Sequence, residues 1–269
     1  MSFLRATSVS PDKSVDGRYH GEVHDGWDIG GNANGGYLIS IAARAMAAAS
    51  GRAHPVTLTA HYLSPGRPGP VTIDTEIVKS GKSFVTVTGS MRAEGKPVLQ
   101  LLGAFSDIKP TGDVLLANGA PPDLPPVEEC IARSDAADHP DLPPFHNKVE
   151  LRLHPEDSVS AEGVRSGKAL VRGWFRLIDD EPLDAFALLQ ASDAFPPTIF
   201  NANLPVAWVP TLELTVQVRS DPAPGWLRGV FTTRFVTDGL LEEDAELWDS
   251  TGRLVALSRQ LALVPRVPS

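Results

Sequence analysis

The sequence has almost no cysteine and no long hydrophobic run, and both absences narrow the class of protein. Among 269 residues there is one cysteine, Cys130, so no internal disulfide can form. The most apolar stretch, residues 37–49, is interrupted by Ser40 and Arg44 and is too short to cross a bilayer. The opening segment, Met-Ser-Phe-Leu-Arg-Ala-Thr, lacks the apolar core of a signal peptide. We therefore expect a cytoplasmic globular protein without a membrane partner.

Basic side chains are also few. The chain carries 24 Lys and Arg against 33 Asp and Glu, a formal net charge of -9. A nucleic-acid groove or an anionic membrane surface would meet a like-charged molecule. The charge balance therefore predicts neither of these as the main partner.

Several motifs of common enzyme classes are missing. There is no Gly-x-Ser-x-Gly elbow, which counts against an α/β-hydrolase. The seven histidines never take His-Glu-x-x-His spacing, and one cysteine cannot build a thiolate zinc site, so we expect no metal. Gly81-Lys82-Ser83 is similar to the end of a phosphate-binding loop, but Glu76 stands where that loop needs glycine. It predicts a hairpin turn, and no cofactor is expected.

A proline-rich region divides the chain into two nearly equal parts. Residues 108–147 contain eight prolines and no sustained apolar period, which predicts a connection laid over a surface, with one helical turn at 127–133. The expected units are therefore residues 1–107 and 148–269.

Each part has the same order of elements. In the first, Ala-rich residues 37–49 predict a helix that Gly51 can end, and an earlier strand is expected at 19–27. In the second, residues 183–201 have a mostly helical pattern that Pro196-Pro197 should bend or interrupt, after a strand at 168–177. Runs rich in Val, Thr, Ile and Phe predict four strands after each helix: 56–63, 71–79, 83–92 and 97–106, then 211–219, 226–236, 241–249 and 254–264.

The two parts also correspond in residue type. Thr57 corresponds to Thr211 and Met91 to Trp248, so the offsets are 154 and 157 residues, a difference that one loop absorbs. The repeat is far longer than that of a solenoid. It indicates an internal duplication of a whole domain.

Two segments contain residues that suit chemistry. The run Gly30 to Gly36 includes Asn34-Gly35-Gly36 immediately before the first helix, where unpaired backbone N–H groups suit a phosphate or a developing oxyanion. A tight turn and close helix packing explain the same glycines. Asp193 stands in a mostly apolar stretch, so its carboxylate either faces water or is functional.

A helix followed by an antiparallel meander, present twice, resembles the double hotdog of the acyl-CoA thioesterase II family. The matching residues are Gly35-Gly36, His61 to Gly66, Gly81 to Phe84 and Gly95 to Pro97, together with Ala191-Ser192-Asp193, Thr211 and Gln260. The resemblance implies an α+β fold, a tandem hotdog in which two curved antiparallel sheets each wrap a central helix. It covers nearly the whole chain outside the proline-rich connection.

The same resemblance implies the activity and the site. Asp193, Thr211 and Gln260 would hold a water that hydrolyses an acyl-CoA without a covalent intermediate, and Gly35, Gly36 and Asn34 would receive the carbonyl oxygen. From the residues alone, Thr211 is a good strand former and Gln260 an exposed strand position. Leu214 stands where family members often carry histidine. The first half lacks a counterpart of Gln260, so one site per chain is expected.

The sequence also predicts binding partners for the chain. Lys79, Lys82 and Arg92 would meet the CoA phosphates, although solvated strand edges explain these charges equally well. Exposed sheet edges favour a homo-oligomer, a dimer of double hotdogs.

One alternative function is a non-catalytic acyl or acyl-CoA binding protein. A less favoured one is a hotdog hydratase, which needs an Asp and His pair that neither His54 nor His61 supplies at the expected spacing.

Overall fold

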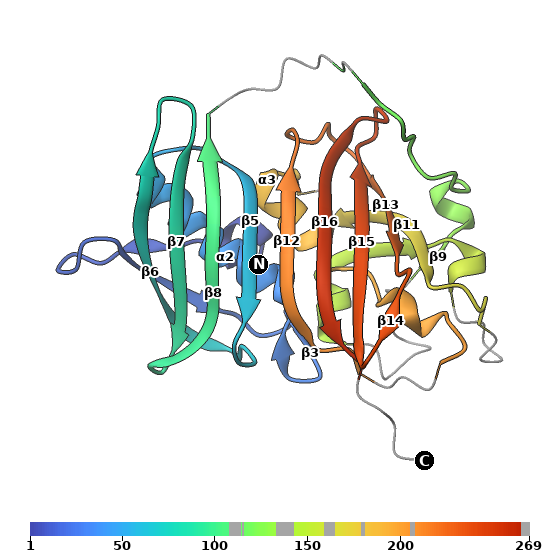
Figure 1. Cartoon of the computed structure of the whole chain (residues 1–269), viewed down its shortest axis with the longest axis horizontal. Helices are drawn as coiled ribbons and strands as arrows, with labels where there is room; N and C mark the ends of the chain where they lie inside the picture. Colours follow the sequence, from blue (N-terminus) through green and yellow to red (C-terminus); the bar gives the residue numbers. More distant parts are fainter. Residues whose placement is uncertain are drawn as a thin grey trace.

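In the computed structural model, two helix-and-sheet units lie side by side and share one antiparallel sheet (Figure 1). The structure describes residues 1–107, 114, 116–132, 143–158, 165–178, 181–204 and 208–264. Within these residues the sheet has 14 strands, and its main path runs β1-β2-β6-β7-β8-β5-β12-β16-β15-β13-β11-β10-β9. The two halves of the sequence therefore meet at the pair β5 and β12.

The first half supplies one side of this sheet. Its strands, all paired antiparallel, are β1 (Ser10–Pro11), β2 (Arg18–Val23), β5 (His54–Tyr62), β6 (Gly69–Ser80), β7 (Val85–Ala93) and β8 (Lys96–Ser106). The predicted strands are confirmed, except that the strand expected to reach residue 27 ends at Val23. Gly81 N–H donates to Phe84 O at 2.9 Å between β6 and β7, so the predicted hairpin turn is confirmed as well.

The second half repeats the arrangement. Its strands are β9 (Ile131–Ala132), β10 (Val149–Leu153), β11 (Leu170–Leu177), β12 (Thr211–Val218), β13 (Leu227–Thr232), β14 (Val236–Thr237), β15 (Leu240–Trp248) and β16 (Leu254–Leu263). The strand expected over 226–236 is divided, because β13 ends at Thr232 and β14 is a separate pair with β15.

The first central helix, α2 (Gly35–Ser50), is gripped on most sides by other structure. Its N-cap is Asn34, whose side-chain Oδ1 accepts from Tyr37 N–H. The helix ends at its C-cap Gly51, which has a φ of 65°. Most of its residues are buried, including the small ones that allow close packing. Opposite it on β7, a Cβ on Gly89 would lie 2.8 Å from Met46 Sδ. The glycine therefore lets the helix sit against the strand.

The second helix is shorter than its sequence pattern suggests. α3 (Ala185–Ala191) is capped by Asp184, and the chain then turns through Ser192. Pro196 and Pro197 lack backbone N–H groups and end the α-helical pattern, so the only further helical turn before 201 is the 3₁₀ segment η5 (Thr198–Phe200). The interruption was predicted, but the expected extent of 183–201 was wrong. α3 packs against α2, and in Figure 1 both helices lie behind the strands.

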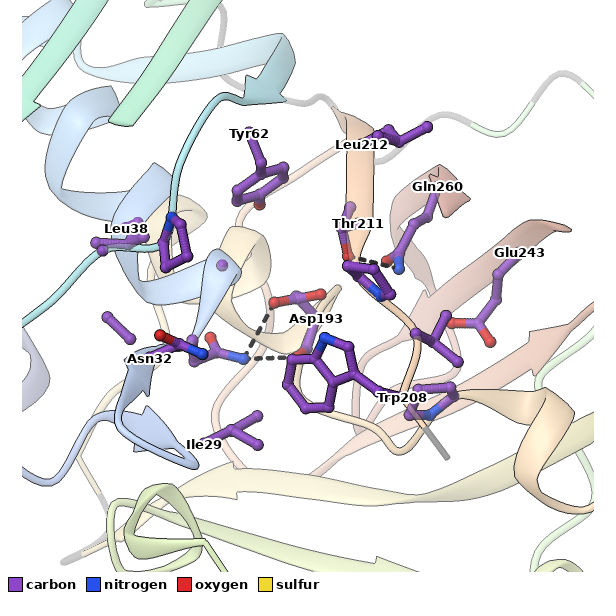
Figure 2. Close-up of a pocket in the computed structure, with 18 of the residues that line it drawn as sticks. Ile29, Asn32, Leu38, Tyr62, Asp193, Trp208, Thr211, Leu212, Glu243 and Gln260 are labelled. Carbon is purple, nitrogen blue, oxygen red and sulfur yellow. Dashed lines mark hydrogen bonds between the residues drawn. The ribbon is translucent and has the colours of Figure 1, made fainter. Parts of the chain in front are cut away.

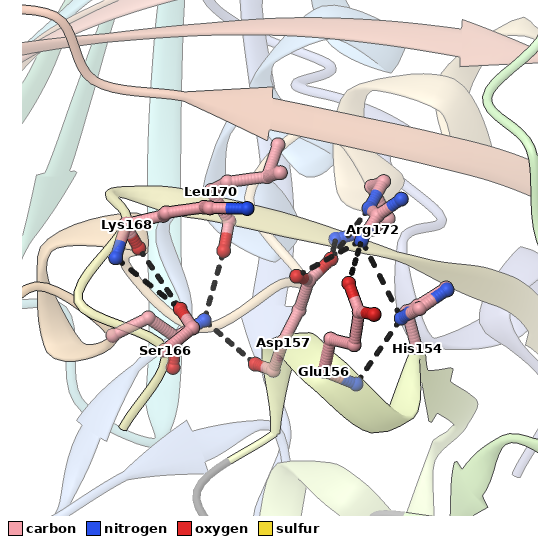
Figure 3. A network of polar contacts seen from close by, with 8 residues as sticks. His154, Glu156, Asp157, Ser166, Lys168, Leu170 and Arg172 are labelled. Carbon is pink, nitrogen blue, oxygen red and sulfur yellow. Dashed lines mark hydrogen bonds and ion pairs between the residues drawn. The ribbon is translucent and has the colours of Figure 1, made fainter.

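A polar network holds η5 against β11 (Figure 3). Asn201 Nδ2 donates to Leu170 O at 2.8 Å and to Asp157 O at 2.6 Å. Asp157, at the end of η3 (Pro155–Asp157), is buried and accepts from Arg172 Nε at 2.7 Å. A buried carboxylate that is paired and hydrogen-bonded in this way fixes backbone position. The network therefore places the segment that leads from α3 to β12.

The proline-rich connection is described only in part. Residues 108–113, 115 and 133–142 lie outside the described residues, so the expected turn at 127–133 is seen only as η1 (Val127–Glu129). Cys130 is buried there as a free thiol. The boundaries 1–107, 108–147 and 148–269 stay a prediction. In the described part of the chain, no helix has the length and apolar character that a bilayer crossing requires.

Candidate active site

A cavity of about 420 Å³ opens between the two units, at the start of α2 (Figure 2). Both halves of the chain line it. Its walls are largely apolar: Ile29, Leu38, Leu63, Phe195, Phe200, Trp208, Val209 and Leu212. The polar side chains that line it include Asn34, Tyr62, Asp193, Thr211, Glu243 and Gln260. All three residues expected to hold a water are therefore at one cavity.

Asp193 follows α3 and points toward the N-terminus of α2. Its Oδ2 accepts from Gly36 N–H at 2.8 Å and from Asn34 Nδ2 at 3.0 Å. Removal from bulk water raises the pKa of Asp193 to about 6, while the N–H groups of Gly36 and Gly35 and the Asn34 amide oppose that rise. The site thus holds a carboxyl group whose ionisation is shifted toward neutral pH, as a general base requires.

Asn34 ties the two helices together. Its Oδ1 accepts from Tyr37 N–H and from Gln190 Nε2, each at 3.0 Å. Its Nδ2 donates to the backbone oxygen of Asp193 at 2.9 Å as well as to Oδ2. The side chain that caps α2 therefore also positions the carboxylate from the other half of the chain.

The glycines that begin α2 are required by close approach. A Cβ on Gly35 would lie 2.7 Å from Tyr62 Oη and 2.9 Å from Asp193 Oδ2. A Cβ on Gly36 would lie 2.9 Å from Gln190 O, a backbone atom of α3. The helix N-terminus is therefore turned toward Asp193, and the Gly36 N–H expected at the carbonyl oxygen is bonded to this carboxylate.

Thr211 and Gln260 lie on neighbouring strands and are bonded to each other. Gln260 Nε2 donates to Thr211 Oγ1 at 2.8 Å, between β16 and β12. Gln260 is 8% exposed, so its interpretation as an exposed strand position was wrong. In the strand register it lies opposite Leu214, which is also buried. The residue that departs from the family pattern is thus a direct neighbour of Gln260.

Glu243 is a second buried carboxyl group that the sequence interpretation missed. It lies opposite Gln260 on β15 and accepts from Thr198 N–H of η5 at 2.7 Å. Burial, with a smaller contribution from the charge of Asp193, raises the pKa of Glu243 to about 7, and hydrogen bonds from Thr198 oppose the rise. Strand alternation contained the signal, because Glu243 shares its face with Leu241, Ala245 and Leu247.

The three basic residues expected to meet CoA are not brought together. Lys79 and Lys82 lie near the turn where Ser80 pairs with Val85. The cavity is at the other end of these strands, where Tyr62 pairs with Leu99. Arg92 lies toward that end, and its Nη1 donates to Gly95 O at 3.1 Å. None of the three lines the cavity. Among the described residues there is also no group of three or more His, Cys, Asp and Glu suited to a metal.

The fold and site define the class, a tandem hotdog protein with an acidic cavity between its units. Residues 23–106 match the family model of the acyl-CoA thioesterase N-terminal domain, and residues 121–264 match that of the C-terminal domain. The chain belongs to this acyl-CoA thioesterase family. The predicted family and the double hotdog fold are therefore confirmed.

Individual relatives match this chain over nearly its whole length. The crystal structure of a proposed thioesterase II from Thermobifida fusca is 31% identical, with a TM-score of 0.87, and the match covers 98% of this chain and 97% of that one. An acyl-CoA thioesterase II, TesB2, from Mycobacterium marinum shares the fold at 18% identity and a TM-score of 0.74, covering 100% and 99%. An uncharacterised protein of Mycobacterium tuberculosis is 28% identical over 97% of this chain and 96% of its own.

Proposed function

We propose that the protein is an acyl-CoA thioesterase that hydrolyses its substrate by direct attack of water, with no covalent intermediate. The observation that carries the proposal is the set of Asp193, Thr211 and Gln260, which come from separate elements and line one largely apolar cavity. An apolar wall suits an acyl group, and the polar set suits a held water. A reducing cytoplasm is the expected compartment.

The hydrogen bonds support distinct roles for the three side chains. Gln260 Nε2 donates to Thr211 Oγ1, so the hydroxyl proton of Thr211 is free to donate to a ligand. Gly36 and Asn34 both bond to Oδ2 of Asp193, so among the described residues these donors leave Oδ1 for another partner. A water held by Thr211 and Asp193 is then positioned to lose a proton to the carboxylate.

The proton transfers of the reaction need no group beyond these. The water oxygen bonds to the thioester carbon as Asp193 accepts the water proton, and the carbonyl π electrons move onto oxygen. When the carbonyl forms again, the C–S bond breaks and the proton passes from Asp193 to the leaving sulfur. The products are a free acid and CoA, and Asp193 is ionised for the next cycle.

The structure favours this proposal over a hydratase. The alternative depended on a histidine in the site, but His54 Nδ1 lies 3.4 Å from Asp221 and His61 is an exposed residue of β5. Neither lines the cavity. A non-catalytic acyl-CoA binding protein is the remaining alternative, and turnover distinguishes it.

The test is thiol release from acyl-CoAs of varied length, branching and aromatic character. We expect turnover of part of the panel and a loss of about 10²-fold or more in Asp193→Asn, because the base is removed while the shape is kept. Asp16→Asn, an exposed loop change, is the matched control and should retain full activity. Tight acyl-CoA binding without thiol release would instead identify the binding protein, and unchanged turnover by folded Asp193→Asn would refute the role of Asp193.

A further inference from the structure

The expected donor for the carbonyl oxygen is already bound to another group. Gly36 N–H donates to Asp193 Oδ2, and Gly35 N–H also acts on that carboxylate. The next N–H groups of the first turn are also bonded, because Tyr37 N donates to Asn34 Oδ1 and Leu38 N to Asn34 O. The N–H groups at the start of α2 are therefore already hydrogen-bonded to Asp193 and to the cap residue Asn34. A developing oxyanion needs a donor from elsewhere.

Tyr62 has an unpaired donor at this place. Its Oη is buried and has no hydrogen-bond partner among the described residues, although the residue lines the cavity. The position of a Cβ on Gly35 is 2.7 Å from Tyr62 Oη and 2.9 Å from Asp193 Oδ2, so the hydroxyl and the carboxylate approach the same point. Figure 2 shows Tyr62 above Asp193, on the side of the cavity away from Gln260. A buried hydroxyl left unpaired costs free energy, so a bound acceptor is favoured.

The hydroxyl also keeps its proton. Burial, together with the charges of Asp193 and Glu213, raises the pKa of Tyr62 well above its usual value. Tyr62 is therefore a hydrogen-bond donor throughout the pH range in which Asp193 ionises.

We propose that the Tyr62 hydroxyl donates a hydrogen bond to the thioester carbonyl oxygen and stabilises its negative charge during hydrolysis. This rests on the proposed function and adds a catalytic residue to it. Water bound at Asp193 and Thr211 attacks the carbonyl carbon, and the electron pair that moves onto oxygen meets the Tyr62 O–H. Tyr62 keeps its proton throughout, because the negative charge on oxygen disappears when the carbonyl forms again and the C–S bond breaks.

The test is Tyr62→Phe, which removes one oxygen atom and keeps the ring. The expected result is a kcat about 10²- to 10³-fold lower, the usual effect of deleting one oxyanion donor, with KM changed less than about threefold. The melting temperature should stay the same or rise, since the lost hydroxyl bonds to no described residue. Tyr19→Phe, on β2 and outside the cavity, is the matched control and should keep wild-type turnover.

Two further measurements separate catalysis from positioning. Tyr62→Phe should keep the pH midpoint of the wild type, because Tyr62 is not hydrogen-bonded to Asp193; a shifted midpoint would show that Tyr62 acts through Asp193 and would overturn the proposal. An alkyl-CoA thioether, which lacks the carbonyl oxygen, should bind both proteins equally, and weaker binding to the variant would also overturn it.

The outcomes distinguish this inference from the proposed function. Turnover by Tyr62→Phe within about threefold of an active wild type overturns the role of Tyr62 and leaves the thioesterase standing. No thiol release by the wild type from any acyl-CoA overturns both.

Discussion

At the scale of single residues, Glu243 gives the protein a measurable pH dependence. The pKa of this group is about 7 in the folded protein, against an ordinary value of 4.5. Between these values the folded state binds the proton more tightly than the unfolded chain, so the contribution of Glu243 to the free energy of unfolding is fully present below pH 4.5 and falls as the pH rises toward 7. We expect the fall to be about 1–3 kcal/mol.

Glu243→Gln tests this directly. The amide keeps an acceptor for Thr198 N–H but does not ionise. The free energy of unfolding of the variant, measured with urea, should therefore decline less between pH 4.5 and 7.5 than that of the wild type. Glu128→Gln, an exposed change, should retain the wild-type decline. Identical pH profiles for wild type and Glu243→Gln would show that Glu243 is not the responsible group.

Residue types were predicted better than their environments. Asp193, Thr211 and Gln260 were selected by family spacing, and the structure brings them to one cavity. The burial of Gln260 was not predicted, because Ser258 and Arg259 make its strand look solvated. The bond between Asp193 and Gly36 joins residues of the two halves, and no local pattern specifies it.

At the scale of elements, the contact between α2 and α3 is set by glycine. Gly36→Ala would place a Cβ 2.9 Å from Gln190 O and 3.0 Å from Asp193 Cβ, and the nearer atom is backbone that cannot rotate away. We expect the free energy of unfolding to fall by about 1–3 kcal/mol, as for other overpacked sites, and activity to fall because Asp193 is displaced.

Urea unfolding and thiol release together measure the effect. Gly119→Ala is the control, since its Cβ would meet Trp248 only at 3.7 Å, an ordinary contact. A Gly36→Ala protein as stable and active as wild type would contradict the proposed close contact.

The predicted strands were more accurate than the second helix. Alternating Val, Thr and Ile between Gly and Pro turns locate β5 to β8 with ends that shift by a few residues. Residues 185–200 are mostly apolar, so periodicity alone did not show where α3 ends. The prolines predicted an interruption, but α3 already ends at Ala191, before either proline.

At the scale of the whole molecule, duplication produces one site from two halves. β5 and β12 pair from His61 opposite Glu213 to Thr57 opposite Gln217, which joins the sheets and sets α2 beside α3. Asn34 and Gly36 come from the first half and Asp193 from the second. Asp193 therefore has its hydrogen-bond donors only when the two halves of the chain are packed together.

Association between chains stays a prediction. The path of described strands ends at β1 and β9, each of two residues, and such short edges do not favour joining sheets edge to edge. Exposed apolar side chains on the strands, such as Leu102 at 50% exposure, offer a different contact. The mass in solution, compared with a chain mass of 28.7 kDa, decides the oligomeric state.

Direct attack by water is the central claim, and oxygen labelling tests it most directly. With enzyme in excess, one turnover of an acyl-CoA in H₂¹⁸O should yield a free acid that carries one ¹⁸O atom, measured by mass spectrometry, and Asp193→Asn should yield almost none in the same time. Unlabelled free acid in the first turnover, or an acyl group bound to the acid-quenched protein in the same mass spectra, would mean that a protein group attacked the thioester, and either result would contradict the account.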